Sequence, residues 1–203
     1  MPLARPNAQR RTSPRIAWAA LAALTLSACG APTRQTFDLS GLPGDRTGAL
    51  ASAPRNGSAR VSIEEPTAVA PFGGERIVIR TEDGGVAFLA DAQWADRATR
   101  LMQRRLIGAF SSSGLAAALP AGPVEAALAF DVRRFEIDAA RGVAVVELMA
   151  TLRDDRSGQR RAAQIFRGEA PAPHTKDGAA ALALEAALDA ATGRLIAWTR
   201  ARL

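Results

Sequence analysis

Three consecutive segments of alternating apolar and polar residues constrain the fold of this chain more than any other feature. They cover residues 125–137, 143–153 and 160–169. Gly142 separates the first two segments, and a turn at residues 154–158 separates the second from the third. A period of two residues places successive side chains on opposite faces of a strand, and short turns join antiparallel neighbours. We therefore predict an antiparallel meander of three strands.

Two other segments repeat apolar residues at every third or fourth position, which predicts amphipathic helices. The first runs from Trp94 to Gly114. The second occupies the C-terminal end, and its apolar residues form one stripe about 100° wide. That stripe consists of Ala181, Leu184, Leu188, Ala191, Leu195 and Trp198. The candidate N-cap residues are Asp91 or Asp96 for the first helix and Thr175 or Asp177 for the second.

The remaining apolar segments predict further strands. Residues 36–39 alternate as in an edge strand, and residues 60–65 form a second strand that Pro66 closes. The segments 76–81 and 86–89 flank a Glu-Asp-Gly-Gly turn and predict a hairpin, after a loop at 67–75. Two helices and these strands give the α+β class, with two layers: a mostly antiparallel sheet with two helices packed on it.

Near the N-terminus, residues 26–29 have the sequence Leu-Ser-Ala-Cys, the form of a bacterial lipobox. Residues 1–15 contain four arginines and no acid, and residues 16–26 are apolar, as in a secretory signal peptide. A transmembrane helix needs about 20 apolar residues, and this run is about half that length. We therefore predict Sec export, cleavage between Ala28 and Cys29, and lipidation of Cys29.

Cleavage at this position predicts three parts. Residues 1–28 form the lipoprotein signal peptide, residues 29–35 the lipidated N-terminus and tether, and residues 36–203 one domain. Within the domain, residues 36–59 include a short strand and a flexible loop. The Pro-, Gly- and Ser-rich composition of residues 31–59 suggests a flexible tether of about thirty residues.

The charge and the residue after the cysteine bear on partners and location. The signal peptide carries four of the 26 basic residues, which leaves 22 basic and 20 acidic residues in the mature protein. This near balance, together with export, argues against a nucleic-acid partner. Gly30 stands where an Asp would commonly retain a lipoprotein in the inner membrane. We expect a lipid anchor in the inner leaflet of the outer membrane, facing the periplasm.

Residues for enzymatic chemistry are scarce. His174 is the only histidine and lies in a Pro-rich loop, Cys29 is the only cysteine, and the chain has no tyrosine. Residues 111–114 (Ser-Ser-Ser-Gly) are typical of a helix end rather than of a nucleophile. Asp154 and Asp155 could form a carboxylate pair, but a Asp-Asp-Arg-Ser-Gly turn between two strands explains them better. We predict no catalytic residues, no metal site and no cofactor.

Two aromatic residues could contact a partner or a lipid. Trp94 at the start of an amphipathic helix is typical of a core anchor, but it could also form the lip of an apolar groove. Phe72 lies in a Pro- and Gly-rich loop, where a core role is less obvious.

The order of several short motifs resembles the ABC-type transport auxiliary lipoproteins. Besides the lipobox, the resemblance rests on motifs spread over residues 35–203. These are Phe-x-Leu at 37–39, Val-x-Ile-x-x-Pro at 61–66, Arg-Ile-Val-Ile-Arg at 76–80, Gln-Trp-Ala-Asp at 93–96, Phe-Asp-Val-Arg-Arg-Phe-Glu at 130–136, Leu-Arg-Asp at 152–154 and a C-terminal Ala/Leu helix with Trp198. Phe37 departs from the pattern, since the family often has Tyr at this position.

The resemblance implies a non-catalytic lipoprotein subunit of a lipid transport system that supports membrane integrity. Its expected partners are a periplasmic MCE-type substrate-binding protein and, through it, an ABC permease and ATPase. A homo-oligomer is a further expectation. The same anchor and fold would also serve a structural or assembly lipoprotein of another envelope or secretion complex.

Overall fold

The computed structural model describes residues 34–39, 60–120, 124–173 and 178–203. Internal contacts divide the chain into two units, Met1–Thr33 and Arg34–Leu203, and all the described residues belong to the second. The signal peptide and the lipobox therefore lie outside the described residues.

The long strand β7 (Ala126–Asp138) forms the centre of the sheet. It pairs antiparallel with β8 (Val143–Asp154), which pairs antiparallel with β9 (Arg160–Pro171). Gly142 adopts a positive φ of 62° in the turn between β7 and β8, a backbone conformation that favours glycine. The predicted meander of three strands is thus confirmed.

The other edge of β7 is shared by three short strands that pair with it in parallel, one after another. These are β2 (Arg60–Ile63), β3 (Thr67–Ala68) and β4 (Arg76–Arg80). β2 pairs with the start of β7, β3 with its middle and β4 with its end. The prediction of a loop at 67–75 is wrong for β3, whose two residues are too few to show a period.

Three further strands extend the sheet. β5 (Val86–Trp94) pairs antiparallel with β4, as the predicted hairpin requires. β1 (Gln35–Phe37) pairs in parallel with the end of β5, and β6 (Ala116–Ala118), which was not predicted, pairs in parallel with β2. The sheet is therefore mixed, although its longest pairings are antiparallel.

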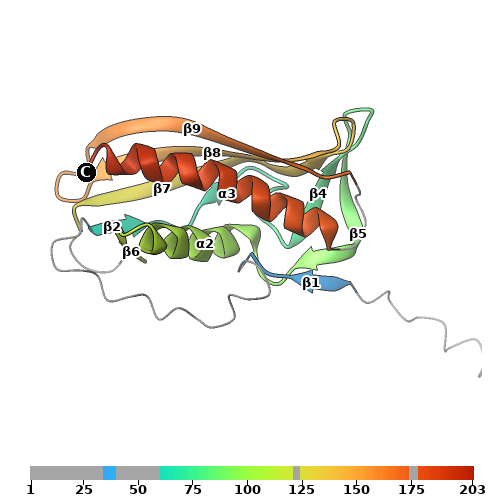
Figure 1. Ribbon diagram of the computed structural model, residues 1–203, viewed down its shortest axis with the longest axis horizontal. Helices are drawn as coiled ribbons and strands as arrows, with labels where there is room; N and C mark the ends of the chain where they lie inside the picture. Colours follow the sequence, from blue (N-terminus) through green and yellow to red (C-terminus); the bar gives the residue numbers. More distant parts are fainter. Residues whose placement is uncertain (1–33, 40–59, 121–123, 174–177) are drawn as a thin grey trace, which may run out of the picture. The chain divides into compact units, whose positions relative to one another are not determined.

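Two helices, α2 (Ala98–Ser112) and α3 (Ala179–Arg200), cover one face of this sheet (Figure 1). α3 lies across β7, β8 and β9, and α2 lies beside β2 and β6. The predicted α+β class with two layers is confirmed.

The first helix begins later than predicted. Trp94 is the last residue of β5, and Arg97 is the N-cap residue of α2, without a side-chain cap. Asp91 lies within β5, and Asp96 accepts a hydrogen bond from the adjacent N–H of Arg97, at 2.7 Å, which precedes the first turn of the helix. The first N–H of the helix instead donates to the carbonyl of Gly74, at 3.0 Å. The predicted caps of α3, Thr175 and Asp177, lie outside the described residues, and Gly178 is its N-cap residue.

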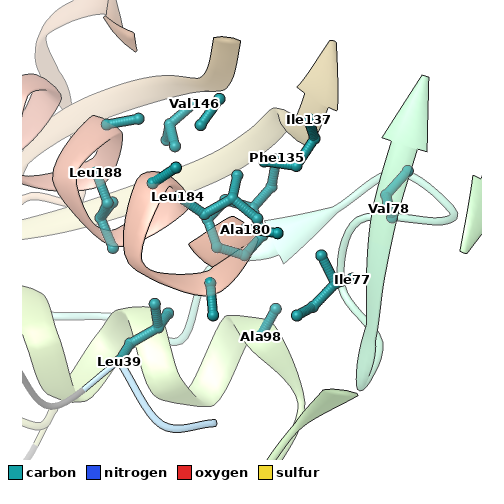
Figure 2. Close-up of a cluster of buried hydrophobic side chains, with 14 of the residues drawn as sticks. Leu39, Ile77, Val78, Ala98, Phe135, Ile137, Val146, Ala180, Leu184 and Leu188 are labelled. Carbon is teal, nitrogen blue, oxygen red and sulfur yellow. The ribbon is translucent and has the colours of Figure 1, made fainter. Parts of the chain in front are cut away.

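The core lies between the helices and the sheet. Every residue of the stripe predicted for α3 is buried, and Leu184 and Leu188 pack in one cluster with Phe135 and Val146 of the sheet (Figure 2). At Gly168 of β9 the backbone of α3 comes so close that an added Cβ would overlap the carbonyl oxygen of Ala187.

The N-terminal strand β1 is anchored to this core. Leu39, two residues after β1, is 1% exposed and joins the same cluster as Leu184 (Figure 2). The ring of Phe37 lies against the N-cap residue Gly178, where an added Cβ would approach it to 2.7 Å. The expectation of one continuous tether over residues 31–59 is therefore wrong at β1 and Leu39, which belong to the folded domain, whereas residues 31–33 and 40–59 lie outside the described residues.

Candidate functional site

The residues predicted for function do not gather into one site. Cys29, Ala28 and His174 lie outside the described residues. Among the described residues, no group of three or more His, Cys, Asp or Glu side chains could hold a metal ion. None of the helices in the described part of the chain has the length and apolar content needed to cross a bilayer.

Trp94 and Phe72 belong to the core. Trp94 is 1% exposed and stacks on Phe135 with a centroid separation of 5.4 Å. Phe72 is 7% exposed and packs in the same cluster. Trp94 is thus the core anchor that its position suggested, and the alternative in which either ring contacts a partner or a lipid is not supported, because the end of β5 and the loop before β4 direct both rings inward.

The two carboxylates of the β8–β9 turn point to different partners. Asp154 accepts hydrogen bonds from the N–H groups of Arg156 and Ser157, at 3.1 and 2.9 Å. Its side chain also pairs with Arg161, and this hydrogen bond holds the pKa of Asp154 well below its usual range. Asp155 accepts from the N–H of Val124 at 3.3 Å. The prediction of a structural turn is confirmed.

An ionic cluster lies on the face of the sheet opposite the helices. Glu136 alternates with the inward residues Phe135 and Ile137 of β7, yet its side chain is fully buried. Arg80 of β4 contacts both of its carboxylate oxygens, at 3.1 and 3.0 Å, and Arg134 contacts one at 2.6 Å. The hydrogen bond to Glu136 raises the pKa of Arg80. The two arginine side chains thus shield the carboxylate and join β4 to β7.

Ion pairs continue from this cluster toward β9. Asp138 lies 3.5 Å from Arg134 and 3.9 Å from Arg141, and Arg141 binds both oxygens of Glu169 at 3.1 and 2.9 Å. These contacts lower the pKa of Glu169, chiefly through the hydrogen bond from Arg141. Every cation of this series has a carboxylate partner, which is the pattern of a structural network rather than of a ligand site.

A pocket of about 520 Å³ opens beside the N-terminal end of α2. Within it, Glu65 accepts hydrogen bonds from Arg97 at 2.6 Å and from Thr99 at 3.2 Å. The carboxylate thus holds α2 to the connection between β2 and β3. The pocket is lined by Glu65, Pro66, Thr67, Ala68, Gly73, Arg97 and Thr99.

The start of β5 forms a surface that combines exposed apolar residues with arginines. Val86 is 50% and Phe88 is 45% exposed. The guanidinium of Arg76 lies over the ring of Phe88 at 5.1 Å and donates to the carbonyl of Leu89 at 3.1 Å. Arg34, just before β1, donates to the carbonyl of Ala90 at 3.2 Å.

We call the surface formed by Arg34, Arg76, Val86 and Phe88 the N-terminal corner. Within the described residues, neither of its arginines lies within 4.0 Å of a carboxylate oxygen, unlike those of the ionic cluster. The sequence did not predict this surface. The alternation of Val86 and Phe88 predicts a strand, but it does not show which face of the strand the rest of the domain leaves exposed.

Comparison with known proteins gives one family. Residues 41–195 match the model of the ABC-type transport auxiliary lipoprotein component. An uncharacterised protein of Bradyrhizobium diazoefficiens is 33% identical over 177 residues, which is 84% of this chain and 46% of the relative. The chain thus spans about half the length of the curated relative that it matches.

Two crystal structures share the fold. A Xanthomonas campestris protein of the DUF330 family is 30% identical, with a TM-score of 0.63 over 72% of this chain and 88% of the other. An uncharacterised protein, 16% identical, has a TM-score of 0.66 over 82% of this chain and 99% of its own, which shows similarity of fold alone.

Proposed function

Because the chain belongs to the family of ABC-type transport auxiliary lipoprotein components, we propose that it is a non-catalytic, lipid-anchored subunit of a lipid transport system. Its role would be to dock a periplasmic MCE-type substrate-binding protein and, through it, an ABC permease and ATPase. It would thereby support membrane integrity. A homo-oligomer is compatible with this role.

The match of residues 41–195 to the family model is the observation that carries the proposal. The match spans the sheet from β2 to β9 and most of α3, so it concerns most of the domain rather than one motif. The charged groups of the ionic cluster and of the β8–β9 turn hold strands together, which suits a binding subunit.

The lipobox supports a proposal for the location. We propose that Cys29 carries the lipid anchor and that the domain faces the periplasm from the inner leaflet of the outer membrane. Cys29→Ala should therefore give a folded protein that is no longer retained by the membrane. If this variant stayed in the membrane fraction, the anchor assignment would be wrong.

Purification of the tagged full chain from detergent extracts tests the partner. We expect an MCE-type protein, together with ABC permease or ATPase subunits, to be recovered with it. Recovery of only secretin or outer-membrane barrel components would refute the proposal and favour the assembly role. Cys29→Ala is the matched control, since it separates specific docking from joint extraction of the membrane.

A further inference from the structure

The position of β1 limits the distance between the domain and the membrane that holds its anchor. This step rests on the proposed anchor at Cys29. Six residue steps separate Cys29 from Gln35, the first residue of β1. An extended chain spans at most about 3.3 to 3.6 Å per residue, so Gln35 lies within about 20 Å of the anchoring cysteine.

The direction of β1 indicates which part of the domain lies closest to the proposed anchor. β1 runs parallel to β5, with Gln35 beside Ala92 and Phe37 beside Trp94. Arg34, the first described residue, therefore lies on the side of Gln35 that leads back along β5 toward Val86. The hydrogen bond from Arg34 to the carbonyl of Ala90 agrees with this direction, because Ala90 precedes Ala92 in β5.

The N-terminal corner therefore lies on the side of the sheet where the described chain begins, at Arg34. Val86 and Phe88 are two residues apart and therefore lie on the same face of β5. Their register partners in β4 are Arg80 and Val78. Apolar side chains of this kind enter the boundary between lipid headgroups and acyl chains, and arginines bind lipid phosphates. A guanidinium has five N–H donors, so Arg34 and Arg76 keep donors beyond those used on β5 carbonyls.

We propose that the N-terminal corner rests on the phospholipid surface of the membrane that holds Cys29. Val86 and Phe88 contact the boundary between headgroups and acyl chains, and Arg34 and Arg76 bind phosphates. The adjacent turn carries the carboxylates of Glu82 and Asp83, so the flank of β5 rather than the tip of the hairpin faces the lipid. A zwitterionic phospholipid supplies the required phosphate without repelling these carboxylates.

Fluorescence quenching by brominated lipid tests this orientation. The full-length lipidated protein carrying Phe88→Trp is reconstituted into phosphatidylcholine vesicles with bromine on the acyl chains. Tryptophan preserves an aromatic face for Arg76, so the substitution should be tolerated. After subtraction of the parent's emission, we expect at least about twofold quenching of the added indole.

Leu119→Trp is the matched control. Leu119 is 55% exposed and follows Ala118, the last residue of β6. Ala118 pairs with Ser62 of β2, which pairs with Ala127 near the start of β7. Phe88 lies beside Val78 and, through it, beside Glu136. The nine residue steps of β7 from Ala127 to Glu136 span about 30 Å, so the control indole should show little quenching.

Vesicle flotation separates failure of the anchor from failure of this inference. If the lipidated protein does not float with the vesicles, the anchor at Cys29 is wrong. If it floats but Phe88→Trp and Leu119→Trp are quenched equally, the orientation is wrong while the proposed function stands. Inserting about twenty Gly and Ser residues between Thr33 and Arg34 should leave flotation unchanged and reduce quenching at position 88. Undiminished quenching would show that the short tether does not set the orientation.

Discussion

Replacing Gly168 by alanine should separate α3 from the edge strand β9. An added Cβ would overlap the carbonyl oxygen of Ala187 and would lie 2.9 Å from both the carbonyl carbon of Ala187 and the backbone nitrogen of Ala191. All these neighbours are backbone atoms of α3, so no flexible side chain can move aside.

The expected cost follows from this geometry. To restore ordinary van der Waals distances, α3 must move away from β9 by more than about 1 Å, which weakens the dispersion contacts along its buried face. Forcing one extra carbon into a packed core costs about 1 to 3 kcal/mol. Because the clash involves backbone on both sides, we expect the upper end, about 3 kcal/mol. For a domain of this size, this loss lowers the melting temperature by about 6 to 12 °C.

Urea and thermal unfolding, followed by circular dichroism, measure the effect. The control is Gly193→Ala, at an exposed position of α3 where an added Cβ meets no atom within 4 Å. It should stabilise the protein by about 0.5 to 1 kcal/mol, because alanine favours helix over glycine. If Gly168→Ala changed the free energy of unfolding by less than about 0.5 kcal/mol while the control behaved as expected, the close packing of α3 on β9 would be refuted.

Three further predictions concern the ionic cluster, β1 and acid stability. Glu136→Gln should lower the free energy of unfolding in urea by about 3 kcal/mol, because it leaves two arginines without their buried counter-charge. Glu169→Gln, which removes the carboxylate of a more exposed ion pair, should lower it by less. Equal losses in the two variants would contradict a structural role for the buried Glu136. Leu39→Ala removes a buried side chain, so it should lower the free energy of unfolding by about 2 to 4 kcal/mol and speed amide hydrogen exchange in β1. Leu182→Ala, at an exposed position, should have neither effect. The hydrogen bond from Arg161 lowers the pKa of Asp154, so this carboxylate stabilises the fold above about pH 4 and loses that effect as the pH falls. In Asp154→Asn, the melting temperature should therefore decline less steeply as the solution is acidified. An unchanged decline would contradict a stabilising role for the ionised Asp154.

The elements with a clear period were predictable from the sequence. The three strands of the meander and the stripe of α3 show periods of two and of three to four residues over ten or more positions. β3 and β6 have two and three residues, too few for any period to appear. The spacing of Trp94 to Ala98 and Leu101 predicts a helix that includes Trp94, but α2 begins only at Ala98, whose N–H donates to the carbonyl of Gly74.

Contacts between distant segments set most of what the sequence did not reveal. Nothing in Arg60–Ile63 or Arg76–Arg80 specifies a parallel pairing with opposite ends of β7. The burial of Glu136 and the approach of α3 at Gly168 likewise arise only when β4, β7, β9 and α3 have assembled. The N-terminal corner belongs to the same class, since it depends on which face of β5 the helices leave uncovered.

The shared use of β7 has a consequence for biogenesis. Val61 pairs with Ala117 of β6 and Val78 with Phe88 of β5, but their second partners, Ala126 and Glu136, lie in β7. The strands of the first half of the domain are therefore joined into one sheet only through β7. Pairings over such sequence distances close slowly, because loop entropy must be lost before they form. We expect the nascent chain to lack its complete fold until β7 has been synthesised, which would keep the precursor unfolded for the export that the signal sequence predicts.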